Sequence, residues 1–490
     1  MRIGSSEIVR IAIVALWVVL IAFLVIRIGR VGEPAAVMVP ADAGLLEGDE
    51  WKGVYYNGTK VGWAHAHVEA TPYGWRVLDE TDLEITLMGE AESVHTRTAA
   101  ELDEALRLRT FRFEMNGKSA TMEVYGTYRE GELALEVRSG HETTTTSIQM
   151  EEPPIVTTGL KAYILKEGLD VGRRVRLQAF DPSVMNNITI EVAVEDKEAI
   201  ESDSGTVDTY RLRTTFHGID LLSWVDEAGR TLREQSPMGF EMRLETRSSA
   251  LAGRRDRSAP DLTIGTAVES NRVIPDARRL RFMKIRIEGP DLSGLDLAGA
   301  GQEMKEGVLT IRSTPPVAAR SFLIPWSAGG EPALHLGSTP LVQSDHPLIR
   351  EEARRILGDE KDAIAAAKRL LDWVDRAIED IPTASLPSAL EVLREKRGDC
   401  NEHAVLFTAL SRAAGIPARI AAGLVYLEGK FFYHAWAEIY LGRWVPVDPV
   451  FGQFPADATH IRLVRGELAG QLAILGVIGR IRLEVLETVD

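Results

Sequence analysis

The chain has 490 residues, a formal net charge of −16 and an isoelectric point near 5.3. This length predicts about two to four domains, and the acidic balance argues against nucleic acid or an anionic membrane surface as the partner of the soluble part. The single cysteine, Cys400, excludes a disulfide within one molecule.

The N-terminal segment predicts a membrane anchor. Residues 11–26 are apolar and uncharged, and flanking arginines can snorkel to both interfaces, so the segment can span a bilayer. A secretory signal peptide usually has a shorter apolar core, and Ala41-Asp42-Ala43 lies too far away for easy cleavage. Arginines on both sides leave the positive-inside rule undecided, but the short N-terminal flank favours an extracytoplasmic, periplasmic location for the bulk of a single-pass membrane protein.

The next part of the chain predicts antiparallel β structure. Asn57-Gly58 marks a hairpin turn, and residues 111–115 and 120–124 alternate around Asn116-Gly117 as a hairpin with one buried face does. A large sheet, sandwich or half-barrel follows. His65 and His67 share one strand face and could bind a ligand, although paired histidines on a strand are more often a solvated face.

Helical periodicity returns after residue 347, with amphipathic patterns at 349–357 and 363–378 and a short helix at 388–396. We therefore expect an α+β fold class with an N-terminal transmembrane helix. The predicted parts are a membrane anchor at 1–30, a tether at 31–49, an antiparallel β domain at 50–255, a small β module at 256–340 and a catalytic α+β domain at 341–490.

Cys400 is predicted to lie in the first turn of a helix. Apolar residues recur with helical spacing from Val405 to Ala413, and Gly415 and Pro417 end the pattern. Unpaired N–H groups and the helix dipole favour an anion at such a position. We therefore expect the pKa of the thiol to fall below its usual value and the same N–H groups to be able to hold an oxyanion.

An imidazole and a carboxylate follow on a predicted hairpin. Leu441-Gly442 separates two β-rich runs, and a turn centred there places Trp436 opposite Asp448 and His434 diagonal to Asp448 on the same face. Diagonal neighbours are within reach of a His–Asp hydrogen bond. A thiol, an imidazole and a carboxylate in this order are the parts of an activated cysteine nucleophile, so Cys400, His434 and Asp448 are the candidate catalytic residues.

Residues from about 345 to 467 resemble the transglutaminase-like core of the papain-like cysteine-enzyme superfamily. The residues that carry the resemblance are Gly398, Cys400, Glu402, Ala404, Leu406, Leu410, Arg412, Gly415 to Arg419, His434-Ala435-Trp436, Glu438, Trp444 and Asp448-Pro449. The resemblance implies Cys400 as nucleophile, His434 as general base and acid, Asp448 as its orienter, and acyl transfer through a thioester. Resemblance to membrane-anchored bacterial proteins of this type also favours the extracytoplasmic location.

The competing site is a metal centre of Cys400, His403, His434 and Asp448. Structural zinc sites usually carry two or more cysteines, so we expect no metal and no cofactor. His403 is expected on the outward side of its helix, His460 in a surface loop, and Trp436 and Trp444 in the core and the cleft wall.

Three functions remain open. The first is thiol-dependent acyl transfer on carboxamide or amide bonds of a protein or peptide substrate, and the second is a cysteine peptidase or amidase of the same superfamily. The third is a non-catalytic, membrane-anchored scaffold whose β modules bind an envelope protein.

Overall fold

The structure is a computed structural model of the whole chain, and it describes residues 47–490 with interruptions. The stretches outside the description are 88–89, 118–120, 140–141, 158–163, 166–167, 184, 203–204, 217–218, 238, 253–266, 290–291, 293, 317–320, 382–387 and 468–470. The chain divides into two compact units, of which the described parts are residues 47–252 and 267–490.

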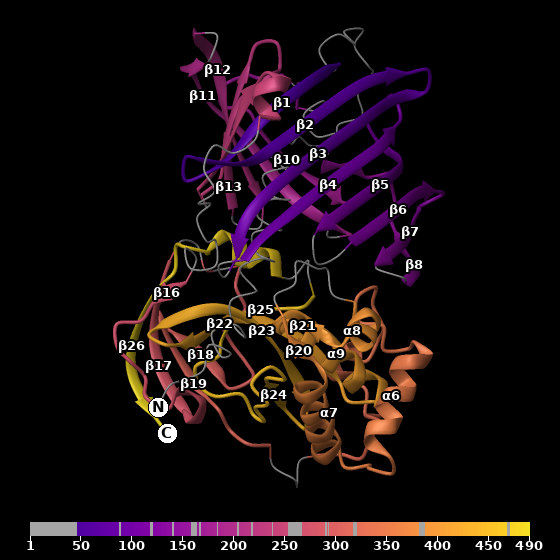
Figure 1. Cartoon of the computed structure of the whole chain (residues 1–490), viewed down its shortest axis with the longest axis vertical. Coiled ribbons are helices and arrows are strands. Elements are labelled where there is room, and N and C mark those ends of the chain that lie inside the picture. Colours follow the sequence, from indigo (N-terminus) through magenta and orange to yellow (C-terminus); the bar gives the residue numbers. More distant parts are fainter. Residues whose placement is uncertain are drawn as a thin grey trace. The chain divides into compact units, whose positions relative to one another are not determined.

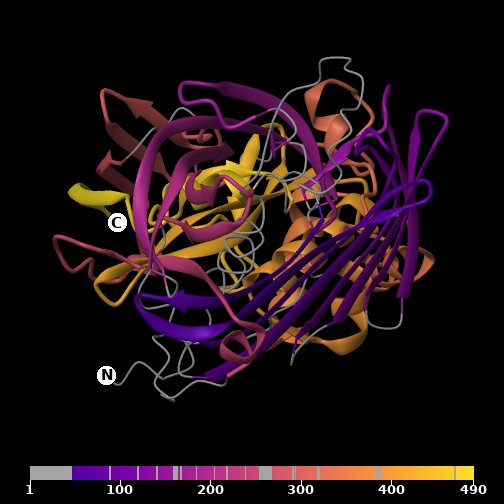
Figure 2. The ribbon, with the colours of Figure 1, turned by 90° about the horizontal axis from the view of Figure 1, so that it is seen from above.

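The first unit is one sheet of 15 strands, in the order β8-β7-β6-β5-β4-β3-β2-β1-β15-β14-β13-β12-β11-β10-β9. Neighbouring strands are antiparallel except β9, which runs parallel to β10. Figure 2 shows the long strands of its first half side by side. The strands are β1 (Gly48–Tyr56), β2 (Thr59–Thr71), β3 (Gly74–Leu87), β4 (Glu90–Leu102), β5 (Leu108–Gly117), β6 (Thr121–Arg129), β7 (Glu132–Ser139), β8 (Glu142–Gln149), β9 (Ile155–Val156), β10 (Arg174–Asp181), β11 (Asn186–Ser202), β12 (Gly205–Phe216), β13 (Ile219–Asp226), β14 (Thr231–Gln235) and β15 (Phe240–Glu245). A short helix, α4 (Arg247–Ala250), follows β15.

Alternation along the strands builds the core of this sheet. In β5, Phe111, Phe113 and Met115 are buried, and the antiparallel register places Phe113 opposite Val124 of β6. Apolar side chains on one face of a pleated strand pack together, while their neighbours point to the other face. Two hairpin series therefore share one sheet, and they meet where Trp51 of β1 pairs with Glu245 of β15.

The second unit combines helices with three further sheets (Figure 1). The helices are α6 (Pro347–Leu357), α7 (Ala363–Ala377), α8 (Ala389–Glu395) and α9 (Cys400–Ala413), with 3-10 helices η3 (Ala277–Arg279), η5 (Glu331–His335) and η6 (Leu472–Gly476). The strands are β16 (Val268–Glu269), β17 (Phe282–Glu288), β18 (Gln302–Lys305), β19 (Val308–Arg312), β20 (Glu379–Asp380), β21 (Arg397–Gly398), β22 (Ala418–Leu427), β23 (Lys430–Tyr440), β24 (Trp444–Val447), β25 (Ile461–Arg465) and β26 (Arg482–Val489).

Helix α9 lies at the centre of this unit. Twelve of its 14 residues are buried, and it contacts α6, α7 and α8 as well as β22 and β23. A helix that is buried all round belongs to the core of its domain. The central sheet, in the order β16-β23-β22-β25 with β24 beside β23, therefore holds α9 from one side and the other three helices surround it.

The C-terminal strand joins the ends of this unit. Strand β26 pairs antiparallel with β17, with Phe282 opposite Val489, in the sheet β18-β19-β17-β26. Strands β17, β18 and β19, which lie in the range that the sequence predicts as a separate small module, thus share a sheet with the last residues of the chain.

The predicted α+β fold class is wrong for the chain as a whole, because strands make up 52% of the structure and helices 17%. The helical patterns after residue 347 do form helices, but the 15-stranded sheet and the three smaller sheets outweigh them.

The predicted membrane anchor also needs correction. Among the residues that the structure describes, no helix is long and apolar enough to span a bilayer, so the assignment as a single-pass membrane protein is not supported. The apolar run at 11–26 itself lies outside the described residues.

Candidate active site

Cys400 is the first residue of α9, and the local sequence explains why the helix starts there. Asp399 caps the helix by accepting a hydrogen bond from the Asn401 N–H (2.8 Å), and Glu402 returns the bond by accepting from the Asp399 N–H (2.9 Å). This reciprocal capping box fixes the N-terminus of a helix. Gly398 has φ +155° and a side chain there would meet Glu402 Cβ at 2.3 Å, so a glycine is needed directly before the cap.

His434 and Asp448 form a buried hydrogen-bonded pair. Ala437 of β23 pairs with Val447 of β24, and continuing this register brings Asp448 beside the face that carries His434. His434 Nε2 donates to Asp448 Oδ2 at 2.8 Å, and both side chains are fully buried. Because an ionised carboxylate only accepts hydrogen bonds, the proton of a neutral His434 is on Nε2 and its lone pair is on Nδ1.

The packing of α9 on β23 brings Cys400 to this pair. The Cys400 thiol is hydrogen-bonded to the backbone of Ala435, the residue directly after His434. His434 Nδ1 is buried and has no hydrogen-bond partner among the described residues. The three predicted residues thus come from three separate elements of one unit, and the imidazole nitrogen that does not contact Asp448 is the one left available to the thiol.

The electrostatics of the pair differ from the expectation for a helix N-terminus. Burial raises the pKa of the Cys400 thiol well above its usual value, the nearby Asp399 carboxylate raises it further, and the Ala435 hydrogen bond opposes this only in part. Burial also lowers the pKa of His434, against the opposing charge of Asp448. These directions favour a neutral thiol and a neutral imidazole at rest, because loss of solvent and the capping carboxylates outweigh the helix dipole at Cys400.

The sequence analysis missed His460, which is buried instead of lying in a surface loop. Its Nε2 donates to the same oxygen of Asp448 as His434 does, at 2.9 Å. Its Nδ1 faces the backbone carbonyl oxygen of Asp457 at 3.1 Å and Asp457 Oδ1 at 3.4 Å. The Asp457-x-Thr459-His460 turn before β25 carries no periodic pattern, so only the tertiary structure places it at the site.

His403, too, is buried instead of facing outward. Its Nδ1 donates a hydrogen bond to the Asp399 carbonyl oxygen at 2.6 Å. Among the described residues, the alternative metal set of Cys400, His403, His434 and Asp448 is not brought together. His434, Asp448 and His460 do offer ligand atoms within 4.8 Å of one another. In this structure both imidazole Nε2 atoms are hydrogen-bonded to Asp448 Oδ2.

Trp436 lies in the core, as predicted, whereas Trp444 is only partly buried. Trp436 is buried with its ring 6.1 Å from that of His434. The guanidinium carbon of Arg419 lies 3.7 Å from the ring centroid of Trp444. Trp444 Nε1 donates a hydrogen bond to Glu331 at 3.0 Å. Trp444 thus belongs to a group of stacked and ion-paired side chains on the outer side of β23 and β24.

The histidines of β2 are held by carboxylates. His65 Nε2 contacts Asp49 at 2.6 Å, and Nδ1 lies 3.3 Å from Glu80. His67 Nδ1 lies 3.3 Å from Asp49, and the ring of Trp51 stacks on His65 at 4.0 Å. These contacts favour the interpretation as a polar sheet face over that as a ligand site.

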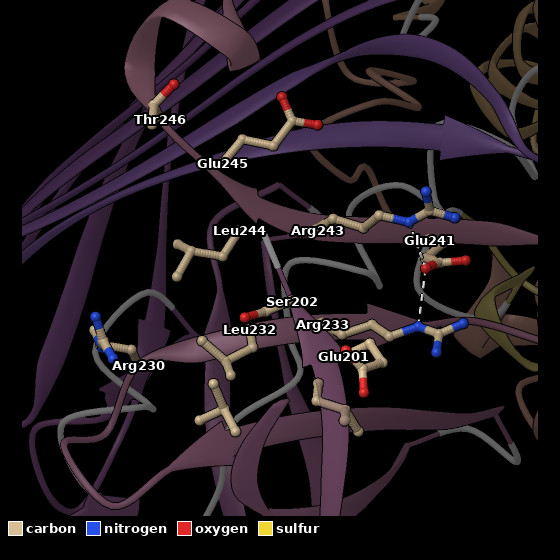
Figure 3. A pocket seen from close by; sticks show the side chains of 12 residues that line it. Glu201, Ser202, Arg230, Leu232, Arg233, Glu241, Arg243, Leu244, Glu245 and Thr246 are labelled. Atoms are coloured by element: carbon tan, nitrogen blue, oxygen red, sulfur yellow. Dashed lines mark hydrogen bonds and ion pairs between the residues drawn. The ribbon is translucent and has the colours of Figure 1, made fainter. Parts of the chain in front are cut away.

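The first unit also contains a hollow of about 600 Å³ beside β14 and β15. Figure 3 shows Arg233 and Arg243 reaching toward the Glu241 carboxylate between them, at 2.8 and 2.7 Å. Arg230, at the other side of the hollow, pairs with Asp226. Each of the three arginines of this hollow therefore already has a carboxylate partner.

Comparison with known proteins supports the reading of the second unit. Residues 350–449, about a fifth of the chain, match the family model of the transglutaminase-like superfamily. No curated protein matches the sequence. The family match supports a general transglutaminase-like function for this part of the chain.

Three solved structures are distantly similar. A candidate cysteine protease from Cytophaga hutchinsonii is 17% identical over 43% of this chain and 88% of its own, with a TM-score of 0.31. A β-barrel-like protein with a domain of unknown function from Brucella abortus is 11% identical over 40% of this chain and 95% of its own (TM-score 0.32). A candidate protease from Parabacteroides distasonis is 10% identical over 84% and 68% (TM-score 0.20). At these TM-scores the similarities carry no functional argument.

Proposed function

We propose that the second unit catalyses thiol-dependent acyl transfer, with Cys400 as nucleophile, His434 as general base and acid, and Asp448 as the group that orients His434. The observation that carries the proposal is the buried His434–Asp448 hydrogen bond of 2.8 Å, which leaves Nδ1 unpaired beside the strand residue that contacts the thiol. A nucleophile, a base and an orienter in this relation make up the general arrangement for covalent catalysis.

The first step transfers the thiol proton to His434 Nδ1 as the sulfur attacks the carbonyl carbon of a carboxamide or peptide bond. Because both groups are neutral at rest, proton transfer accompanies the attack instead of preceding it. The tetrahedral intermediate collapses when the imidazolium protonates the leaving amine, and a thioester remains on Cys400. A second amine or a water molecule, deprotonated by His434, then attacks the thioester and restores the thiol.

The negative oxygen of the intermediate needs hydrogen-bond donors. The N–H groups in the first turn of α9 are suitably placed for a carbonyl bound at Cys400. Two further buried donors, Asn401 Nδ2 and Trp436 Nε1, have no hydrogen-bond partner among the described residues. Both lie within two residues of a proposed catalytic group, so they are the candidates for the second donor.

A peptidase or amidase differs from a transferase only in what attacks the thioester, so one experiment distinguishes the two. The full chain is incubated with a peptide mixture and a fluorescent primary amine, and products are identified by mass spectrometry. We expect amine incorporation by the wild type, none by Cys400→Ala, and a large loss in His434→Gln. Cleaved or deamidated peptides without incorporated amine would assign a peptidase or amidase instead.

The scaffold alternative has one specific observation in its favour: the Cys400 thiol is 0% exposed and its pKa is raised. A purely structural thiol has this environment. The matched control is His95→Gln, a partly exposed histidine of the other unit, which is expected to retain activity. If the wild type gives no product and no acyl adduct on its single cysteine with any peptide, the scaffold interpretation replaces acyl transfer.

A further inference from the structure

Two imidazoles share one oxygen of the central carboxylate. His434 Nε2 and His460 Nε2 lie 2.8 and 2.9 Å from Asp448 Oδ2, and their ring centroids are 5.9 Å apart. Asp448 Oδ1 accepts from the backbone N–H groups of Val450 (2.8 Å) and Phe451 (3.3 Å). The carboxylate is therefore held from four directions, and only one of its partners, His434, is explained by the proposed reaction.

The surroundings of His460 require both of its ring nitrogens to carry protons. Nε2 faces the Asp448 carboxylate, and Nδ1 faces the Asp457 carbonyl oxygen and carboxylate. All of these oxygen atoms are acceptors. A neutral imidazole would therefore place the lone pair of its unprotonated nitrogen against the lone pair of an acceptor oxygen. Burial alone would lower the pKa of His460, but the Asp457 charge and the hydrogen bonds to Asp448 and Asp457 raise it to about 9.

Asp457 is itself fixed as an anion. Its Oδ1 accepts from the backbone N–H of Thr459 at 2.8 Å, and its Oδ2 pairs with Arg278 of η3 at 2.7 Å. Against the effect of burial, the His460 and Arg278 charges lower the pKa of Asp457 to about 2. The charged groups around His460 are thus Asp448, Asp457, Arg278 and, when protonated, His434, and all of these except the half-buried Arg278 are buried.

We propose that His460 is a positioning residue of the site: as an imidazolium held between Asp457 and Asp448, it fixes the Asp448 carboxylate and places a positive charge next to His434. The proposal rests on the proposed function, because it assigns His460 a role in the reaction of Cys400 and His434. Its chemical effect is to disfavour a second proton on His434, so that His434 stays neutral and able to accept the thiol proton.

The sign of the expected pH effect follows from the charge. Removing a positive charge about 6 Å from His434 makes protonation of the Cys400–His434 pair easier, so both limbs of its pH profile move to higher pH. A neighbouring charge at this range typically shifts a pKa by about one unit or more. A residue that only filled space would change the rate at every pH without moving the limbs.

The test is the pH dependence of the rate of acyl transfer in the full-length wild type and His460→Gln. Glutamine can still donate to Asp448 but carries no charge. We expect the variant profile to lie about one pH unit above that of the wild type. Asp457→Asn, which removes the anion that holds His460 charged, should shift the profile in the same direction and serves if His460→Gln does not fold.

The control is His335→Gln in the same unit, since His335 contacts Glu331 and Trp444 instead of the proposed catalytic residues. Suppose that the wild-type pH profile changes in His434→Gln but is superimposable on the profiles of His460→Gln and Asp457→Asn. This result would overturn the positioning role of His460 and leave the proposed function intact. A wild-type profile that is the same in His434→Gln would overturn both.

Discussion

Replacing Glu438 by glutamine should destabilise the second unit more than any exposed charge change. The Glu438 side chain is 1% exposed and lies between two buried arginines: Arg419 Nη2 at 2.8 Å and Arg462 Nη1 at 2.5 Å. The amide of a glutamine keeps the shape and one acceptor oxygen but removes the charge that compensates both guanidinium groups.

The size of the effect follows from what each arginine retains. Removing one partner of a buried ion pair typically costs about 3–5 kcal/mol. Arg419 keeps Glu331 at 3.0 Å, and Arg462 keeps Asp296 at 3.3 Å and the Gly299 carbonyl oxygen at 3.1 Å. We therefore expect the lower end, about 3 kcal/mol, which is a shift of about 1 M in the urea midpoint for a typical m-value.

Cys400 provides a probe that reports on this unit alone. The thiol is buried and is the only cysteine of the chain, so pulses of a thiol reagent across a urea series measure unfolding of α9 independently of the 15-stranded sheet. The matched control is Glu487→Gln, which removes the exposed pair with Lys284 (3.2 Å) in the same unit and should cost less than about 1 kcal/mol. Equal midpoints for Glu438→Gln and Glu487→Gln would refute the reasoning.

Three further predictions use the same protein. Gly423→Ala should destabilise the unit by about 3 kcal/mol or more, because the new Cβ would lie 1.9 Å from the Ile461 carbonyl oxygen in the β22–β25 pairing; an unchanged urea midpoint would contradict this. Asp448→Asn should lower the turnover of acyl transfer by about 10⁴-fold, because an amide at this place can favour the wrong tautomer of His434; turnover within tenfold of wild type would argue against the assigned role. The pKa of His460 rises from about 6.5 in the unfolded chain to about 9 in the folded protein. Its protonation therefore contributes stability that is complete below pH 6.5 and is lost as the pH rises through 9. The urea midpoint should fall between pH 7 and pH 9 in the wild type and should fall less in His460→Gln.

Local patterns in the sequence were sufficient for part of the site. The turn at Leu441-Gly442 set the strand register, and this register alone placed His434 within reach of Asp448, where the structure has a 2.8 Å hydrogen bond. The Asp399 and Glu402 capping box is likewise readable from spacing. The helix signals around Cys400 suggested a low thiol pKa, however, and burial reverses its direction. Burial depends on the helices and strands that surround α9, and a local pattern does not contain them.

The remaining features depend on contacts between distant segments. His460 reaches Asp448 through a loop without periodicity, and β26 completes a sheet with β17, about 200 residues earlier in the chain. The predicted α+β fold class was wrong because helical periodicity is visible over a short stretch of sequence. The fraction of residues in strands depends instead on strand pairings that extend through the whole first unit.

The junction of β1 and β15 has a consequence for how the first unit folds. Antiparallel neighbours on either side of it are joined by short connections, so their contacts have low sequence separation and form quickly. Pairing Trp51 with Glu245 instead closes a loop of nearly the whole unit, whose entropic cost grows with its length. Two independently nucleated ribbons should therefore exist before they join. A circular permutant of residues 47–252, with these two ends linked and new ends opened between β8 and β9, would make this junction local and speed the slowest step of folding.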